Sequence, residues 1–399
     1  MKLHQRNMDK TAIFRLSKVK DNMSDADKML CLANNTGNMV FDNALGKIIK
    51  GESVYDYFSQ EELAKYDRFI TTSYIWIRQN QPIHSCFSKI GDKPYIPMSV
   101  GLQASEYDPK FILHPDVVRE LTEISERCVI GCRGYYTAEI LNKYGIKNTM
   151  VIGCPSVYTN MFDNQEVPHK PLSKAPKLSA NFITLWRTLK KNEQEFLKYA
   201  CDHEMSFIEQ TSNELKREYL NCSSSDADKI ENWIKNEKIF YSYDEWAEFI
   251  KEYEFSFGFR FHGNVIALNN HVPALFIYSD SRVKEMCEFF HFPMISANEF
   301  DCSKPIEYWY EKADYSEFNK TQNKRIENLK EFCKKNNIEL NTPESVVNKC
   351  VEPEKIIVSS ATSKFGKILS NEKYEFGKVW KRIDFEGKSL FMSDGKTIW

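Results

Sequence analysis

The sequence contains none of the short motifs that usually mark zinc or dinucleotide sites. Cys-x-x-Cys, His-Glu-x-x-His and Gly-x-Gly-x-x-Gly are absent, and Gly395-Lys396-Thr397 has no glycine-rich loop before it. The 11 cysteines are an odd number in a long chain. We interpret them as reduced thiols packed as small hydrophobes, without disulfides. The sequence therefore predicts no metal site and no bound cofactor.

The chain also lacks a charge excess and long apolar runs. Its 54 Lys and Arg residues nearly balance 56 Asp and Glu residues, for a formal net charge of −2. No strong field therefore attracts polyanions, and nucleic acid is not an expected partner. Residues 1–20 carry no continuous apolar stretch of the kind that a signal peptide needs, and no run of about 18 apolar residues is present to span a bilayer. We expect a cytoplasmic protein without a transmembrane segment.

The first half of the chain alternates short apolar runs with amphipathic stretches. Hydrophobic periodicity and turn residues predict a buried strand at Asp27–Ala33, a helix at Phe41–Ile49, strands at Tyr74–Ile77 and Tyr95–Val100, a helix from Pro115, a strand at Arg127–Gly131, a helix at Tyr136–Tyr144 and a strand at Thr149–Ile152. Strands that alternate with helices in this way predict a parallel sheet covered on both faces.

A polar, proline-rich segment from Val167 to Pro176 is the predicted domain boundary. After it the pattern restarts, with a strand at Asn181–Trp186, a helix at Asn192–His203, a strand at Met205–Ile208, a helix at Asp244–Tyr253, a strand at Glu254–Phe259, a helix from Asn264, a strand at Ala274–Tyr278, a helix through Val283 to Phe290, and one long charged helix over Ala313–Asn337. That long helix either closes the second domain or crosses back to the first.

These patterns predict an α/β fold of two facing, doubly wound, Rossmann-like domains. The first covers residues 1–166 and the second, with the catalytic segment, residues 177–350. Residues 351–399 shift to aromatics, charges and turns, and we expect a small appendage of strands whose role the sequence does not reveal.

Polar residues at strand-to-helix junctions are the candidate ligand-binding groups. In open parallel sheets, ligands bind beyond the carboxyl ends of the strands, where loops and helix N-termini present free N–H groups. Three such junctions lie at Gly37-Asn38, at Arg133 and at Ser156. Each has an ordinary interpretation as well: a polar turn for the first, a surface arginine paired with a local acid for the second, and a plain turn for the third.

The fourth junction places a cation and an imidazole directly after an apolar strand. The strand Phe255–Phe259 runs into Arg260-Phe261-His262-Gly263-Asn264. Alternation puts Arg260 and His262 on one face if the extended geometry persists. A histidine of the core is the ordinary interpretation, but a buried, unpaired arginine beside it is costly unless an anion binds. We therefore take this segment as the centre of the site.

Asp280 and Arg282 close the next strand ahead of another helix, and Glu285 lies one turn later. The aspartate and the arginine can pair with each other or orient groups of a ligand. The sequence leaves both possibilities open.

The segment from Phe257 to Leu268 resembles the carboxyl-terminal signature of the polysaccharide pyruvyl transferase family. In that signature an Arg-x-His-Gly segment precedes a small helix, a Val-Pro and an Asp-Ser-Arg. Further segments fall in the family's order: Asn35–Asn38, Ser99–Gln103, Arg133, Gly153–Ser156, Val272–Ile277 and Asp280–Met286. One departure is Cys154-Pro155-Ser156, which stands where many members carry Asp-Pro.

The resemblance implies a fold like that of the GT-B glycosyltransferases. It also implies transfer of pyruvate from phosphoenolpyruvate to a pair of sugar hydroxyls as a ketal, in the synthesis of an exopolysaccharide or cell-surface glycan. Arg133, Arg260 and His262 match positions that bind phosphoenolpyruvate and perform catalysis. Arginine forks suit its phosphate and carboxylate, and His262 is expected to act as general acid and later as base.

The implied partners are phosphoenolpyruvate as co-substrate and a sugar acceptor that is free, nucleotide-linked or lipid-linked. Peripheral association with the polysaccharide assembly machinery is compatible with this function. The expected catalytic residues are His262, Arg260 and Arg133. The expected substrate-binding residues are Gly37, Asn38, Phe261, Asn264, Ser156, Asp280 and Arg282.

Two other functions remain open. A GT-B-like glycosyltransferase that uses a nucleotide sugar is one, because a two-domain cleft with arginines at strand ends suits a diphosphate equally well. A non-catalytic sugar-binding scaffold is the other.

Overall fold

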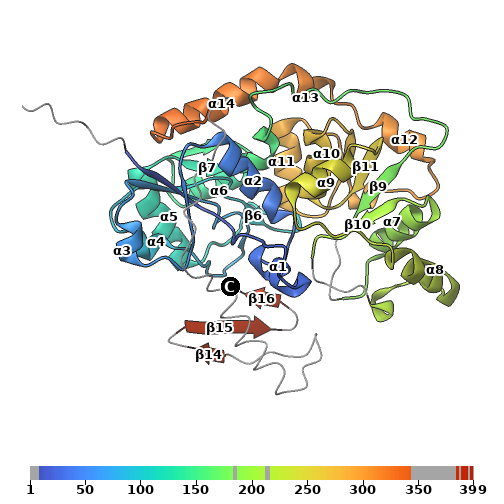
Figure 1. Cartoon of the computed structure of the whole chain (residues 1–399), viewed down its shortest axis with the longest axis horizontal. Helices are drawn as coiled ribbons and strands as arrows, with labels where there is room; N and C mark the ends of the chain where they lie inside the picture. The colour runs from blue at the N-terminus through green and yellow to red at the C-terminus, as the bar shows by residue number, and fades with distance from the viewer. Residues whose placement is uncertain are drawn as a thin grey trace, which may run out of the picture.

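The computed structural model describes residues 9–182, 187–211 and 216–342, and the backbone of three short strands within 383–398 (Figure 1). Two parallel sheets, each with helices around it, make up most of the described chain. The first is built from residues up to Val151 and the second from residues after Lys177. The predicted α/β class is therefore confirmed.

The first sheet has four parallel strands in the order β2-β1-β3-β5. A parallel bridge between Val100 and Cys132 connects it to the parallel pair β7-β8. The strands are β1 Thr11–Phe14, β2 Glu52–Val54, β3 Arg68–Thr71, β5 Tyr95–Pro97, β7 Ile130–Cys132 and β8 Thr149–Val151. The chain leaves β1 toward one edge and then fills the other side, which is the doubly wound pattern.

Six helices accompany this sheet: α1 Asp25–Cys31, α2 Asn38–Ile48, α3 Gln60–Leu63, α4 Phe87–Ile90, α5 Pro115–Arg127 and α6 Tyr135–Lys143. A short parallel pair, β4 Ile77–Arg78 and β6 Leu102–Gln103, lies beside it. Helix α5 begins as the sequence predicts, because Pro115 fits the first turn and the His114 side chain accepts a hydrogen bond from Asp116 N.

The second sheet has five parallel strands in the order β10-β9-β11-β12-β13. Its strands are β9 Leu178–Asn181, β10 Ser206–Ile208, β11 Phe255–Gly258, β12 Ala274–Tyr278 and β13 Met294–Ser296. Its helices are α7 Lys191–Asp202, α8 Ser224–Ile234, α9 Tyr243–Ile250, α10 Phe261–Asn269 and α11 Ser281–Phe290. The strand order reverses between β9 and β11, and this switch point is where ligands bind in open α/β sheets.

The C-terminal helices of the described chain cross back over the first sheet, as Figure 1 shows for α14. The predicted single helix over Ala313–Asn337 is wrong in detail, because the structure has α12 Ile306–Glu311, α13 Ser316–Lys320 and α14 Gln322–Lys335. Asn328 Nδ2 donates to Val151 O at 2.8 Å, and Val129 N donates to Asn336 Oδ1 at 2.8 Å. Helix α14 thus ties the second half of the chain to the first.

Three other predicted elements are wrong. Asp27–Ala33 belongs to helix α1, because Ser24 caps it by accepting a hydrogen bond from Asp27 N and acidic residues fill its first turn. Gly37 therefore follows a helix and not a strand. Tyr74–Ile77 is mostly a turn that leads into β4. The strand predicted at 181–186 ends at Asn181, and residues 183–186 lie outside the described part.

Residues 167–176 contain no helix or strand, and the domain boundary placed there stays a prediction. Near the C-terminus, β14 Ile383–Phe385, β15 Lys388–Ser393 and β16 Lys396–Ile398 pair antiparallel. Strands were expected in this appendage. The rest of 343–399 lies outside the described residues.

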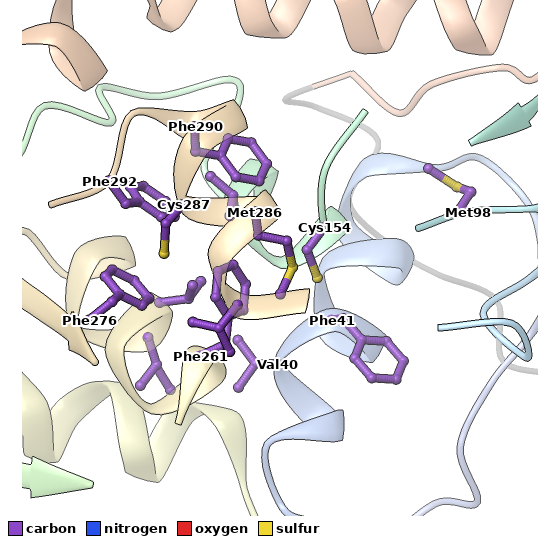
Figure 2. Packing of buried hydrophobic residues seen from close by; sticks show 14 of the residues in the cluster. Val40, Phe41, Met98, Cys154, Phe261, Phe276, Met286, Cys287, Phe290 and Phe292 are labelled. Atoms are coloured by element: carbon purple, nitrogen blue, oxygen red, sulfur yellow. The ribbon is translucent and has the colours of Figure 1, made fainter. Parts of the chain in front are cut away.

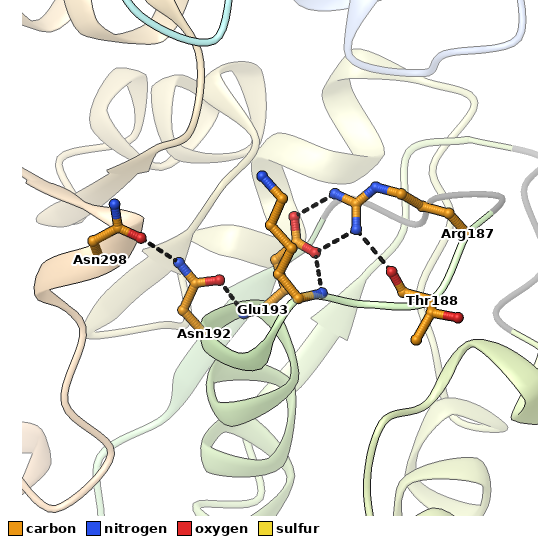
Figure 3. A network of polar contacts seen from close by, with 6 residues as sticks. Arg187, Thr188, Asn192, Glu193 and Asn298 are labelled. Carbon is orange, nitrogen blue, oxygen red and sulfur yellow. Dashed lines mark hydrogen bonds and ion pairs between the residues drawn. The ribbon is translucent and has the colours of Figure 1, made fainter.

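The start of α7 is fixed by one buried carboxylate (Figure 3). Glu193 accepts hydrogen bonds from Arg187 Nη1 and Nη2, both at 2.9 Å, and from Lys190 N at 2.7 Å. Asn192 Nδ2 donates to Asn298 Oδ1 at 3.1 Å. A carboxylate at a helix N-terminus also complements the helix dipole. This network orients α7 against the second sheet.

Apolar side chains from both halves form one continuous core. Figure 2 shows part of it, where Val40 of α2 lies beside Phe261 of α10. In the described residues ten cysteines are free and eight of them are buried, in agreement with thiols packed as small hydrophobes. No helix among the described residues is both long and apolar enough to cross a membrane.

Candidate active site

The strand β11 ends at Gly258, one residue before the predicted end at Phe259. This end point determines where Arg260 and His262 lie. A Cβ added to Gly258 would lie 1.9 Å from Asn181 O, so only glycine lets the two strands approach so closely. The chain then turns, and Arg260 is the N-cap of α10 while His262 lies in its first turn. The extended geometry on which the alternation argument depended therefore does not persist to His262.

Arg260 is held at the switch point of the second sheet. Its Nε donates to Phe182 O at 3.0 Å, and its backbone N donates to Asn181 Oδ1 at 2.7 Å. Glu209, which follows β10, places Oε1 at 3.8 Å from Arg260 Nη2. Burial lowers the pKa of Arg260, and the Glu209 charge opposes this shift. Arg260 is thus a cation with a carboxylate close by.

Asn264 supports this loop from inside the protein. It is fully buried, and its Nδ2 donates to Gly258 O at 3.0 Å. Its Oδ1 accepts hydrogen bonds from Asn181 Nδ2 at 2.7 Å and from Ser256 Oγ at 3.0 Å. These hydrogen bonds give Asn264 a positioning role in the loop, and its expected role in substrate binding stays a prediction.

Arg133 comes from the first sheet, directly after β7. Only 4% of the residue is exposed, and its Nε donates to Ser99 Oγ at 3.0 Å. Ser99 has a φ of 70°, a conformation that non-glycine residues rarely adopt outside functional sites. Within the described residues, no carboxylate lies within 4.0 Å of the Arg133 guanidinium. Burial, as the largest effect, lowers the pKa of Arg133.

Asp280 and Arg282 pair with each other at the start of α11. Arg282 Nη2 lies 2.8 Å from Asp280 Oδ2, while Asp280 Oδ1 accepts from the backbone N of Arg282 and of Val283. Burial raises the pKa of Asp280, but the Arg282 charge and these hydrogen bonds outweigh it, so the pKa is lowered overall. The buried Nε of Arg282 has no hydrogen-bond partner in the described structure, and is free for a ligand.

His262 lies where these arginines converge. Its Nε2 is 3.5 Å from Cys154 Sγ, and its ring centroid is 5.6 Å from that of Phe41. Burial lowers the pKa of His262, and the charges of Arg133, Arg282 and Arg260 lower it further, to about 3. The imidazole is therefore neutral in the empty site at neutral pH.

Glu285 of α11 reaches across to the first half of the chain. It is 1% exposed, and it accepts hydrogen bonds from Thr137 Oγ1 at 2.7 Å and Thr137 N at 3.0 Å. A Cβ added to Gly134, the N-cap of α6, would lie 2.5 Å from Glu285 Cβ. Burial raises the pKa of Glu285 to about 8. The protonated Glu285 carboxyl thus connects α11 to α6, the helix that follows Arg133.

Gly37 lies at the same junction of the two halves. A Cβ added there would lie 2.4 Å from Gln210 Oε1 and 3.2 Å from His262 Cβ. The neighbouring Thr36 N donates to Gln210 O at 2.7 Å. Gly37 is required for this close approach, so it shapes the wall behind His262.

Three other expected contacts lie in packed surroundings. Asn38 Nδ2 donates to Leu32 O at 3.0 Å. Ser156 is fully buried, and its Oγ donates to Cys154 Sγ at 3.1 Å. Phe261 is 6% exposed and packs in the core. These contacts support α2, Cys154 and α10, and the expectation that the three residues contact substrate stays a prediction.

Sequence reasoning missed four residues that border the site: Asn181, Ser99, Glu209 and Gln210. Glu209 and Gln210 directly follow the strand that was predicted to end at Ile208. The junction rule would have found them if it had been applied there. Asn181 was missed because β9 was placed too late in the chain.

The structure thus places arginines at the carboxyl ends of two parallel sheets. This is an α/β protein of the Rossmann-like type, and guanidinium groups in such positions can bind an anion. The family model for polysaccharide pyruvyl transferase matches residues 37–281, which is more than half of the chain. The chain belongs to the polysaccharide pyruvyl transferase family.

Several solved structures are similar at low identity. The MnaA–UDP co-structure from S. aureus has 11% identity and a TM-score of 0.41, covering 81% of this chain and 96% of that chain. CalG4, the calicheamicin glycosyltransferase, has 12% identity and a TM-score of 0.34, covering 88% and 82%. The wall teichoic acid polymerase TagF has 9% identity and a TM-score of 0.33, covering 91% and 89%. No curated protein matches the sequence.

Proposed function

We propose that this protein transfers pyruvate from phosphoenolpyruvate to a pair of sugar hydroxyls and forms a cyclic ketal in the synthesis of an exopolysaccharide or cell-surface glycan. The observation that carries the proposal is the placement of Arg133, Arg260 and Arg282 after strands of both sheets, with His262 in the first turn of α10 and 3.5 Å from Cys154 Sγ. Membership in the family supports this reaction. The arginines come from both halves of the chain, so the site is complete only when the two halves are together.

The charges of the site suit a small dianion or trianion. Three guanidinium groups face two carboxylates, Asp280 and Glu209. Glu285 adds no negative charge at neutral pH, because its pKa is raised to about 8. The site therefore holds an excess of positive charge. Phosphoenolpyruvate carries a phosphate and a carboxylate close together, and each accepts paired hydrogen bonds from a guanidinium.

His262 is the residue that we assign to proton transfer. Ketal formation adds one proton to the methylene carbon of phosphoenolpyruvate, forms two C–O bonds at the adjacent carbon and breaks the bond to phosphate. In this scheme His262 protonates the methylene carbon and recovers a proton from the first hydroxyl as that hydroxyl attacks. The proton of the second hydroxyl leaves with the phosphate. One imidazole thus acts as acid and then as base.

The low pKa of the His262 imidazole suggests how substrate activates this residue. With a pKa of about 3, the imidazole has no proton to give at neutral pH. A bound phosphate and carboxylate offset the arginine charges that lower this pKa, so substrate binding raises it. The protonated form of His262 then exists mainly when phosphoenolpyruvate is bound. Without phosphoenolpyruvate, His262 stays neutral.

We assign to Cys154 a role in orienting the His262 ring. Its Sγ lies 3.5 Å from His262 Nε2 and accepts a hydrogen bond from Ser156 Oγ at 3.1 Å. A thiol is a weak hydrogen-bond partner, so it orients the ring without strongly fixing its proton. The departure from Asp at this position is therefore compatible with proton transfer.

Binding and turnover test the proposal separately. Calorimetric titration with phosphoenolpyruvate and with UDP-sugars identifies the donor, and phosphate release in the presence of β-galactosides and N-acetylhexosamines identifies the transfer. We expect phosphoenolpyruvate to bind and phosphate release to require a sugar. Binding of a nucleotide sugar with no binding of phosphoenolpyruvate would indicate a glycosyltransferase instead. Binding without turnover across the panel would indicate a sugar-binding scaffold.

The matched control for arginine variants is Arg119→Gln. Arg119 is exposed on α5 and pairs with Asp116 at 2.7 Å. Its removal changes the net charge as much as removal of Arg133 does. We expect it to leave phosphoenolpyruvate binding unchanged.

A further inference from the structure

Trp76 lies on a turn that is fastened to the backbone beside Arg133. Gly101 N donates to Tyr74 O at 3.0 Å, and Ile77 N donates to Gly101 O at 2.8 Å. A Cβ added to Gly101 would lie 2.6 Å from Arg133 Cδ. Trp76 itself is 39% exposed, which is unusual for so large an apolar side chain. The turn that carries this exposed indole is therefore bonded to Gly101, which packs against Arg133 of the candidate active site.

Arg78 lies against this indole. Its Cζ is 4.8 Å from the centroid of the Trp76 ring, and its Nε is 3.5 Å from Gln103 Oε1. Burial lowers the pKa of Arg78, and the charge of Arg282 lowers it further. Among the described residues, no carboxylate lies within 4.0 Å of the Arg78 guanidinium. Arg78 is thus a half-buried cation without a counter-ion.

Backbone contacts fix this arrangement. Arg78 of β4 pairs with Gln103 of β6. Leu102, also in β6, accepts a hydrogen bond from Ser281 Oγ at 2.6 Å. Ser281 directly precedes Arg282 at the start of α11. The strand that carries Arg78 is therefore tied, through β6, to the helix that carries Arg282.

We propose that Trp76 and Arg78 form the acceptor subsite, with the sugar ring packed on the indole and a phosphate of the acceptor bound by Arg78. The C–H groups on one face of a sugar ring carry partial positive charge and pack well on the negative face of an aromatic ring. A desolvated cation without a carboxylate partner is costly unless an anion binds. In the proposed reaction phosphoenolpyruvate occupies the other arginines, so the anion on Arg78 belongs to the acceptor.

This inference rests on the proposed pyruvyl transfer and narrows its acceptor. A neutral free sugar fits the indole but leaves Arg78 unpaired. A glycosyl phosphate or diphosphate satisfies both residues. Nucleotide-linked and lipid-linked sugars share this chemistry, and the acceptor is expected to be one of these two.

The test measures the KM of acceptors for phosphate release at saturating phosphoenolpyruvate. The probes are UDP-galactose, UDP-N-acetylglucosamine, the same two sugars linked to farnesyl diphosphate, and their methyl β-glycosides. We expect a diphosphate-linked probe to have a KM at least about ten-fold below that of its methyl glycoside. The preferred carrier, UDP or farnesyl diphosphate, identifies the source of the phosphate.

Two variants separate the roles of the pair. Trp76→Ala is expected to raise the KM of every active probe by about ten-fold, because the stacking contact is common to all. Arg78→Met is expected to raise the KM of the diphosphate-linked probes only, and thereby to remove their advantage over methyl glycosides. The controls are Tyr308→Ala, which removes a 41% exposed aromatic on α12, and Arg119→Gln on α5.

Direct binding of phosphoenolpyruvate keeps this test distinct from the test of the proposed function. If the wild-type protein binds no phosphoenolpyruvate, the proposed function fails. If the wild type turns over and Trp76→Ala leaves every acceptor KM unchanged, only the acceptor subsite is overturned. A methyl glycoside that is as good an acceptor as its diphosphate-linked form also overturns it.

Discussion

Arg133 of the first half and Arg260 of the second half each follow a strand, but the two have different surroundings. Arg260, in the second half, has Glu209 Oε1 at 3.8 Å and donates from Nε to the backbone at Phe182. Arg133, in the first half, donates from Nε to a neutral hydroxyl, Ser99 Oγ, and has no carboxylate within 4.0 Å among the described residues. Both are buried.

This difference indicates which arginine depends on a ligand. A buried cation with a nearby carboxylate is partly stabilised by the protein itself, whereas one without it destabilises the empty fold. Arg133 is therefore expected to contribute more to anion binding than Arg260. Arg260 is expected to contribute more to the stability of the empty protein.

The largest expected effect comes from His262, on which both arginines act. His262→Ala is expected to lower the rate of phosphate release by about 10²- to 10⁴-fold, because the proton donor is lost. The affinity for phosphoenolpyruvate should change by less than about three-fold, since the arginines remain. A stopped assay for phosphate and calorimetric titration measure the two effects. An unchanged rate would contradict the catalytic role.

Arg133→Met and Arg260→Met test the comparison directly. Arg133→Met is expected to weaken phosphoenolpyruvate binding by about 100-fold, and to raise the free energy of unfolding of the empty protein by about 1 kcal/mol, because a costly buried charge is removed. Arg260→Met is expected to weaken binding less and to lower the free energy of unfolding by about 1–3 kcal/mol, since it loses hydrogen bonds. Denaturant unfolding without ligand measures the sign. A change in the free energy of unfolding with the same sign in both variants would contradict the comparison.

The pKa of His262 depends on the charges of Arg133 and Arg260, and so it offers a second test of the comparison. Its pKa of about 3 is expected to rise by at least about one unit when inorganic phosphate binds, because the arginine charges are offset. Arg133→Met should raise the pKa in the empty protein more than Arg260→Met does, since Arg133 has the larger influence. NMR titration of the imidazole measures these values. A pKa that phosphate does not move would remove the proposed activation by substrate.

The smallest expected effect is the pH dependence of stability that Glu285 causes. It bears on the comparison because the charge of Glu285 acts on Arg133. Its folded pKa of about 8 is above the ordinary 4.5, so the folded protein keeps a proton that the unfolded chain loses. The free energy of unfolding is therefore expected to fall as pH rises from 4.5 to about 8, by at most about 1.4 kcal/mol per pH unit, and to level off above.

Glu285→Gln is expected to remove this pH dependence, because the amide does not titrate. Denaturant unfolding between pH 5 and pH 9 measures the slope, and Glu139→Gln, an exposed acid on α6, is the control. Above pH 8 the ionised Glu285 should also compensate Arg133 and weaken phosphate binding in the wild type alone. An unchanged slope in Glu285→Gln would show that another group carries it.

The centre of the candidate site could be found in the sequence because it follows a simple rule. Arg133, Arg260 and Asp280 all lie directly after buried strands, and parallel strands end at one edge of a sheet. The rule failed where strands were misplaced. Asp27–Ala33 was assigned to a strand although Ser24 caps a helix there, and Asn181 was taken for the start of β9 when it is the end.

The contacts that cross between the halves could not be predicted from local pattern. Glu285 meets Thr137, and Gly37 packs against Gln210 and His262, over separations of more than a hundred residues. Local sequence fixes neither which side chains meet nor how buried they become. The contrast between Arg133 and Arg260 likewise depends on one carboxylate, Glu209, that lies about fifty positions from the nearer arginine.

The sequence by itself determined the α/β class, most of the helices and strands of the second half, and the segment from Arg260 to His262 as the centre of a candidate site. These depend on periodicity and on the polarity of strand ends, which are local properties. The sequence did not predict strands β1, β2 and β3 of the first sheet. Only the tertiary structure decided that His262 lies among three arginines and is neutral when the site is empty. Charge and burial act through space, and so the protonation of a side chain depends on neighbours that the chain brings together only when it folds.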